Sequence, residues 1–152
     1  MNEKALIKKS FPNLKGATSF KVTSPATPQY NCIAWAAGVD TQWWWPIDGK
    51  FWPPNVIRVV TVQAFVAAFG TIGYEICETG ALEDGFEKIV LYVDSKGEPT
   101  HAARQLPGGQ WTSKLGESWD IAHKLPLGLE GHLYGTVSIF LKRGVAKAIL
   151  KA

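Results

Sequence analysis

Residues 85–116 of this 152-residue chain read GFEKIVLYVDSKGEPTHAARQLPGGQWTSKLG, and this stretch decides the predicted fold. Its residues 87–94 form a nearly continuous apolar run, which predicts a strand buried on both faces of a sheet. After a turn at residues 95–97, further strands are predicted at 100–106 and 110–115. These two flank Gly108 and Gly109, a pair that favours a two-residue hairpin turn. The stretch therefore predicts consecutive antiparallel strands.

Helices are predicted before these strands. Asn31 is a good N-cap and Gly38 a good C-terminal stop for a short helix between them, and Thr61 can cap a second helix over residues 62–69. Alternating or apolar runs predict two more strands, at residues 72–78 and 134–142. Because helices come first and antiparallel strands follow, the sequence predicts an α+β fold with N-terminal helices packed on a small antiparallel β-sheet.

The length and composition indicate a single globular domain. The chain is 46% hydrophobic and 19% charged, and about 150 residues can bury one sizeable core without disulfides or metal ions. We predict an irregular N-terminal arm over residues 1–29, because this segment lacks sustained periodicity. Residues 30–143 are predicted to form the α+β domain, and residues 144–152 a basic C-terminal tail.

Charge and motifs argue against several classes of function. The 16 Lys and Arg exceed the 13 Asp and Glu by three and form no basic block, so no nucleic-acid partner is expected. No signal peptide and no apolar run of about 18 residues is visible, so we expect a cytoplasmic protein without a membrane partner, with export by a specialised secretion system left open. The sequence has no CxxC, HExxH or P-loop motif, and we expect no metal and no cofactor.

Cys32 and His101 are the candidate nucleophile and base. Cys32 lies in the first turn of a predicted helix, where unpaired N–H groups favour a thiolate. His101 lies at the start of a predicted core strand, which could hold its ring against that helix. A thiol beside an imidazole is the minimal equipment for acyl transfer by cysteine. The alternative is that Cys32 is a packed apolar side chain, the common fate of a free cysteine.

A third residue should orient the imidazole. With Gly108 and Gly109 as a two-residue loop, Arg104 would oppose Ser113, and strand alternation would place Ser113 on the face opposite His101. Asp120 follows the strand closely and carries the charge that an imidazolium favours. We therefore expect Asp120 in the orienting role, with a solvated helix-start residue as the alternative.

A tryptophan-rich loop offers a second hypothesis. Trp43, Trp44 and Trp45 are followed by Trp52, and such rings stack on sugars, peptides or bases when exposed. We take Asn31, Trp44 and Trp52 as candidate substrate-binding residues. In the alternative reading the chain is a non-catalytic binding module that uses this loop, and Cys32 is only packed. A mainly structural loop is also consistent with the usual burial of tryptophan.

Several blocks together resemble an uncharacterised bacterial family, a domain of unknown function. The blocks are YNCIAWAAG (30–38), WWWP (43–46), GFEKIVLYVD (85–94), THAARQLPGGQWTSKLG (100–116) and DIAHKLPLGLEGHLYG (120–135). The family is similar in layout to papain-like cysteine hydrolases, especially the cell-wall amidase and endopeptidase branch.

This resemblance implies a papain-like α+β fold and a cysteine hydrolase. By position it implies that Cys32 is the nucleophile and His101 the base. The expected substrate is a peptide, a peptidoglycan-like compound or another compound with an amide, isopeptide or acyl bond. The predicted strand offers no Asn or Asp for the third role, which departs from the papain-like pattern and leaves that role to Asp120 by elimination. A toxin-associated or effector-associated accessory domain is a further alternative.

Overall fold

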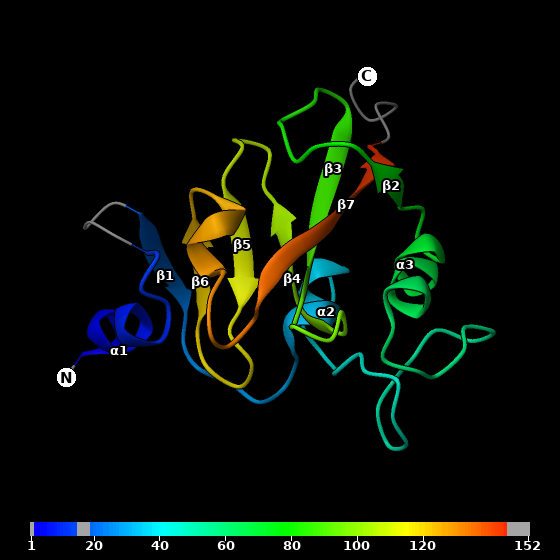
Figure 1. Ribbon diagram of the computed structural model, residues 1–152, viewed down its shortest axis with the longest axis horizontal. Helices are drawn as coiled ribbons and strands as arrows, with labels where there is room; N and C mark the ends of the chain where they lie inside the picture. The colour runs from blue at the N-terminus through cyan, green and yellow to red at the C-terminus, as the bar shows by residue number, and fades with distance from the viewer. Residues whose placement is uncertain (1, 15–18, 146–152) are drawn as a thin grey trace.

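The computed structural model describes residues 2–14 and 19–145, which form short helices around one large sheet (Figure 1). In chain order the elements are α1 (Glu3–Ser10), β1 (Phe20–Ser24), α2 (Cys32–Ala36), α3 (Val62–Gly70), β2 (Glu75–Cys77), β3 (Phe86–Val93), β4 (Pro99–Gln105), β5 (Trp111–Lys114), β6 (Asp120–His123), η1 (Pro126–Leu129) and β7 (Thr136–Gly144). The seven strands lie in the order β1-β6-β5-β4-β3-β7-β2, and each of these pairs is antiparallel. The fold is mixed and mostly β.

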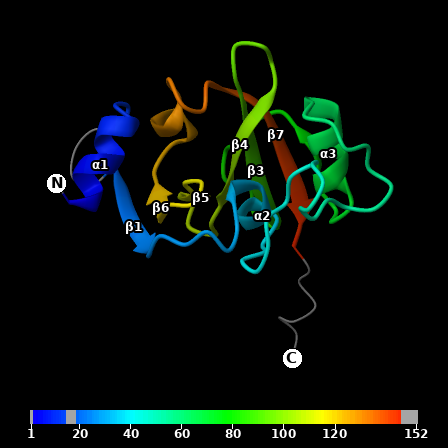
Figure 2. The same ribbon diagram turned by 90° about the horizontal axis from the view of Figure 1, so that it is seen from below.

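Each face of the sheet carries its own hydrophobic core. Ile89 and Leu91 of β3 pack in a cluster with α2, α3 and the tryptophan loop. Val90 and Tyr92 of the same strand pack in a second cluster with α1 and η1. Seen from below in Figure 2, α1 and α2 lie against opposite faces. The prediction that this strand is buried on both faces is therefore confirmed.

The two predicted N-terminal helices are present with their predicted caps. The side chain of Asn31 accepts a hydrogen bond from the Ala34 N–H at 3.1 Å and starts α2. The Thr61 hydroxyl does the same for Ala64 at 3.1 Å and starts α3. Each cap satisfies an N–H group that lacks a partner within the helix. Local chemistry therefore accounts for both helix starts.

The first 29 residues are more regular than the irregular arm that the sequence predicts. Asn2 caps α1 through the Ala5 N–H at 2.9 Å, and Ile7 is buried in the core. The following strand β1 forms the edge of the sheet by pairing with β6, for example Phe20 with His123. No strand was predicted over β6 either. Strands β1 and β6 pair with each other across about a hundred residues of sequence, so a local sequence pattern does not predict them.

At the other end, the last predicted strand is confirmed as β7 and runs two residues further than expected, to Gly144. The predicted basic tail of residues 144–152 therefore starts within β7, and residues 146–152 lie outside the described residues. Within residues 2–14 and 19–145, no helix is long and apolar enough to cross a membrane.

The hairpin between β4 and β5 has a three-residue loop, so the predicted two-residue turn is wrong. The Leu106 N–H donates to the Gln110 carbonyl at 2.7 Å, and the loop of residues 107–109 lies between them. Gly109 has φ +96°, a conformation that favours glycine. The extra loop residue shifts the register by one, so that Arg104 pairs with Thr112 instead of Ser113. A shift of one residue moves every side chain of the strand to the other face.

Candidate functional site

Cys32 lies at the first residue of α2, against the backbone of β4. Its side chain is buried, and Sγ lies 4.0 Å from the Thr100 carbonyl oxygen. The Ala102 N–H also interacts with the sulfur. Strand β5 pairs with β4 only at Arg104 and Gln105, which leaves the first part of β4 without that neighbour. The sulfur therefore contacts the peptide groups on both sides of His101.

The environment of Cys32 holds it as a neutral thiol at neutral pH. Burial raises the pKa of the Cys32 thiol to about 11. The N–H groups of Ala102, Ile33 and Cys32 itself, and the Lys114 ammonium, act in the opposite direction. These donors would stabilise negative charge at or near the sulfur once it forms.

His101 belongs to a chain of hydrogen bonds on the face of the sheet that carries α1. Its Nε2 lies 3.0 Å from the Ser113 hydroxyl, which in turn lies 2.8 Å from Nε2 of His123. The Nδ1 atom of His123 lies 3.1 Å from the Leu125 carbonyl oxygen. We call His101, Ser113, His123 and the Leu125 carbonyl the histidine relay.

The relay determines where the protons lie when both rings are neutral. A carbonyl oxygen can only accept, so His123 Nδ1 carries a hydrogen and donates it to Leu125. Nε2 of His123 must then accept from the Ser113 hydroxyl, and the Ser113 oxygen must accept from Nε2 of His101. The remaining nitrogen, Nδ1 of His101, therefore has a free lone pair. This atom is buried and has no hydrogen-bond partner among the residues that the structure describes.

The His101 ring is buried between aromatic side chains. The Tyr134 ring stacks on it at a centroid distance of 4.0 Å and an angle of 7°, and the Tyr92 ring lies at 5.2 Å. Burial, and then the nearby His123, hold the pKa of His101 well below its usual range. The imidazole is therefore neutral at neutral pH, with Nδ1 able to accept a proton.

Asp120 lies with Tyr30 on the α2 side of the sheet. Its Oδ2 accepts a hydrogen bond of 2.6 Å from the Tyr30 hydroxyl. Burial lowers the pKa of Lys114, and the charge of Asp120 opposes part of this shift. Strand alternation separates Asp120 from Ser113, because Asp120 pairs with Lys114 across β5 and β6. The structure thus brings Ser113, and not Asp120, to the Nε2 atom of His101.

Asn31, Trp44 and Trp52 have packing roles in this structure. The Asn31 side chain donates to the Trp44 carbonyl at 2.9 Å and accepts from the Trp44 N–H at 3.0 Å, which ties the loop to α2. Trp44 and Trp52 are only 5% and 3% exposed. The Trp52 ring packs on Phe65 of α3 at 5.0 Å. These three side chains therefore face the core.

Ser113 and His123 are site residues that the sequence reasoning missed. The register expected for a two-residue loop places Ser113 on the face opposite His101. Had the loop been taken as Pro107, Gly108 and Gly109, alternation would have placed Ser113 beside His101. His123 ends the unpredicted strand β6, so no pattern placed its side chain.

The comparisons with known proteins show the family. A family model described as Domain of unknown function (DUF7689) matches residues 21–142. The chain belongs to this family. No curated protein and no solved structure matches the chain.

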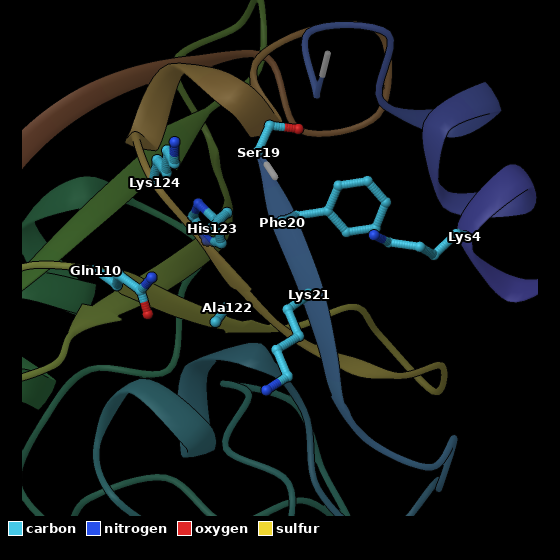
Figure 3. A pocket seen from close by; sticks show the side chains of 8 residues that line it. All are labelled: Lys4, Ser19, Phe20, Lys21, Gln110, Ala122, His123 and Lys124. Atoms are coloured by element: carbon cyan, nitrogen blue, oxygen red, sulfur yellow. The ribbon is translucent and has the colours of Figure 1, made fainter. Parts of the chain in front are cut away.

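The DUF7689 match includes Cys32 and every member of the histidine relay. His123 also helps to line a depression of about 380 Å³ that is basic because lysines contribute to its lining (Figure 3). Lys21 of β1 and Lys124 after β6 contribute to its lining. Within the described residues, no group of three or more His, Cys, Asp or Glu side chains could hold a metal ion.

Proposed function

We propose that this protein is a cysteine hydrolase of papain-like layout that cleaves an amide, isopeptide or related acyl bond. Cys32 is the nucleophile and His101 is the general base. The observation that carries the proposal is that the Cys32 sulfur contacts the peptide groups on both sides of His101. The buried Nδ1 of that residue has no hydrogen-bond partner among the described residues, the sulfur included. A base for a thiol needs such an unoccupied nitrogen, and an orienting partner on the other nitrogen.

In the proposed reaction the substrate carbonyl carbon approaches Sγ of Cys32. His101 Nδ1 removes the thiol proton while the sulfur forms a bond to the carbon, and the carbonyl oxygen becomes an oxyanion. The imidazolium then gives the proton to the leaving nitrogen or oxygen as its bond to the carbon breaks, which leaves a thioester. Water attacks the thioester with His101 again as the base. The imidazolium returns the proton to the Cys32 sulfur as the carbon–sulfur bond breaks, which releases the acid product and restores the neutral pair.

The proposed proton transfer is coupled to attack and does not start from a preformed ion pair. Burial raises the pKa of Cys32 to about 11 and lowers that of His101, so the neutral pair is favoured in the resting protein. The Ala102, Ile33 and Cys32 N–H groups, which already interact with the sulfur, would donate to the developing charge. Both reacting side chains are buried and no hydrogen bond joins them in the described part of the chain, so the substrate must displace part of their cover and bring Sγ and Nδ1 together.

Ser113 and His123 act as positioning residues in this proposal. Ser113 holds Nε2 of His101, and His123 holds the Ser113 hydroxyl. Asp120 is assigned a different task, to hold Tyr30 and the charge of Lys114 near Cys32. The binding-module alternative receives less support, since Trp44 and Trp52 are core residues.

The test is the alkylation of Cys32 by a small chloromethyl ketone in the Cys77→Ser background. This background is needed because Cys77 is partly exposed and would react on its own. At pH 7 we expect His101→Ala to lower the alkylation rate by roughly 100-fold, the usual contribution of a general base. Mass spectrometry of the modified peptide gives the site, and circular dichroism checks the fold.

The pH profile separates base catalysis from simple exposure. With His101 present, the rate should be level from pH 6 to 8, because the base is already deprotonated there. Without His101, the rate should rise tenfold per pH unit, following the small thiolate fraction of a thiol with a pKa of about 11. Identical rates and profiles for the two proteins would rule out the proposed mechanism.

A further inference from the structure

An apolar cavity of about 360 Å³ opens on the α1 side of the sheet, at the end where Tyr134 covers His101. It lies between α1, the turn that joins β5 to β6, and the loop of residues 131–135. Its apolar lining is made mainly by Leu6, Phe11, Leu115, Trp119, Leu133 and Tyr134. Ser10, Ser118 and Lys9 also line it. No Asp or Glu does, among the residues described.

Tyr134 lines this cavity and also contacts His101 of the candidate site. One face of the ring stacks on His101 at 4.0 Å. The same residue lines the cavity, so Tyr134 contacts the general base and belongs to the cavity wall at once. Burial, and then the charge of Cys32, raise the pKa of Tyr134.

The loop that carries Tyr134 is closed by glycines at both ends. Gly131 and Gly135 exchange backbone hydrogen bonds of 2.9 and 2.8 Å, and their φ angles are +146° and +79°. The Thr100 hydroxyl donates to the Tyr134 carbonyl at 2.6 Å and holds the loop on β4. The loop that carries Tyr134 is therefore held against Thr100, the residue that precedes His101.

We propose that this cavity binds an apolar side chain of the substrate, aromatic or branched aliphatic, next to the bond that Cys32 attacks. The inference rests on the proposed function. The cavity has the size and lining for such a group, and Tyr134 places it beside the base. Because no acidic residue lines the cavity and Lys9 does, the bound segment is neutral or anionic, and not cationic.

The experiment compares two chloromethyl ketones that differ in one group, an acetyl-glycine reagent and an acetyl-phenylalanine reagent. The rates of Cys32 alkylation are measured in the Cys77→Ser background. We expect the phenylalanine reagent to react about tenfold faster, the low end of what an apolar pocket contributes to discrimination.

Leu133→Ser is the test variant, and Leu127→Ser is its matched control. Leu133 lines the cavity and is 51% exposed, whereas Leu127 in η1 is 55% exposed and does not line it. Both changes therefore replace a half-exposed leucine by serine. The ratio of the two rates should fall towards one in Leu133→Ser and stay unchanged in Leu127→Ser.

The outcomes separate the two proposals. Equal rates for both reagents, with the dependence on His101 retained, would overturn the cavity assignment and leave the hydrolase proposal standing. Loss of the preference in both leucine variants would also overturn the assignment, because the effect would not be local. Rates that do not depend on His101 with either reagent would overturn the hydrolase proposal itself.

Discussion

Ser113 is the residue on which the candidate site depends most. Its hydroxyl joins two buried imidazoles, accepting from one ring and donating to the other. A methyl group there would leave the Nε2 atoms of His101 and His123 without partners in the protein interior. An unsatisfied buried polar group costs about 1–3 kcal/mol, and here it would also free the His101 ring to reorient.

We expect Ser113→Ala to lower the free energy of unfolding by about 1–3 kcal/mol and to slow Cys32 alkylation at pH 7. Urea unfolding and the alkylation assay measure the two effects. Thr112→Ala is the control, since Thr112 faces the other side of β5 and its hydroxyl accepts a hydrogen bond from Trp35 Nε1 at 3.2 Å. The control should lose some stability but keep its alkylation profile. Ser113→Thr keeps a hydroxyl at this position and should keep the alkylation rate of the wild-type protein. An alkylation rate unaffected in Ser113→Ala would remove Ser113 from the site.

Protonation of the relay makes stability depend on pH. Burial lowers the pKa of His123 from 6.5 to about 4, and that of His101 is lowered as well. Between pH 4 and 6.5 the His123 ring is protonated in the unfolded chain but neutral in the folded chain, so the unfolded chain binds more protons. The contribution of this ring to the free energy of unfolding is therefore complete above pH 6.5 and falls as the pH drops towards 4.

For His123 alone, the loss between pH 7 and pH 5 should be about 2 kcal/mol. Urea unfolding at both pH values measures it. His123→Gln removes one of the titrating rings and should reduce the difference between the two pH values. A wild-type stability that is equal at pH 7 and pH 5 would show that the relay is not buried in its neutral form.

At the scale of elements, the loop before β7 sets the position of Tyr134. Gly135 has φ +79°, and a Cβ built there would lie 1.9 Å from the Val93 carbonyl oxygen. Backbone atoms of β3 cannot move aside without breaking the ladder with β7. Any side chain at this position must therefore push the loop, and with it Tyr134, off the sheet.

We expect Gly135→Ala to cost about 3 kcal/mol in unfolding free energy, from left-handed strain and overpacking together. Gly108→Ala is the matched control, because Gly108 has nothing within 4 Å of a built Cβ and no positive φ. Thermal and urea unfolding distinguish the two variants. Equal stabilities would mean that the loop is not held against β3 as described.

At the scale of the whole molecule, the tryptophan loop completes the core on the α2 side. Trp44 and Trp52 belong to the same cluster as Phe65, Ile89 and Leu141. The loop therefore spans from α2 to α3 and covers that face of the sheet. Trp43 differs, because it is partly exposed and donates to the Pro28 carbonyl at 2.7 Å.

Trp52→Ala should cost about 3–5 kcal/mol as a large-to-small change in a core. Trp43→Ala should cost about 1 kcal/mol or less. Denaturant unfolding of both variants gives the comparison. Should Trp52→Ala prove as stable as wild type, the loop would be free to present its rings to a ligand, and the binding-module hypothesis would regain support.

Much of the local structure could be predicted. The caps at Asn31 and Thr61 act on N–H groups three residues away, so the starts of α2 and α3 follow from short sequence patterns. The apolar run of β3 predicted its burial on two faces, and both cores confirm it. Cys32 and His101 are candidates by residue type and position, and their catalytic roles stay a prediction.

Only the tertiary structure decided how these pieces meet. The partner of β1 is β6, about a hundred residues along the chain, and no local pattern encodes such a pairing. One additional loop residue at 107–109 decided the face on which Ser113 lies. Helix caps and apolar runs depend on neighbours a few residues away, and the sequence by itself therefore determined them. The face on which each side chain lies, the strand register and the histidine relay depend on burial across the whole sheet. A register shift of one residue moves every side chain of a strand to the other face.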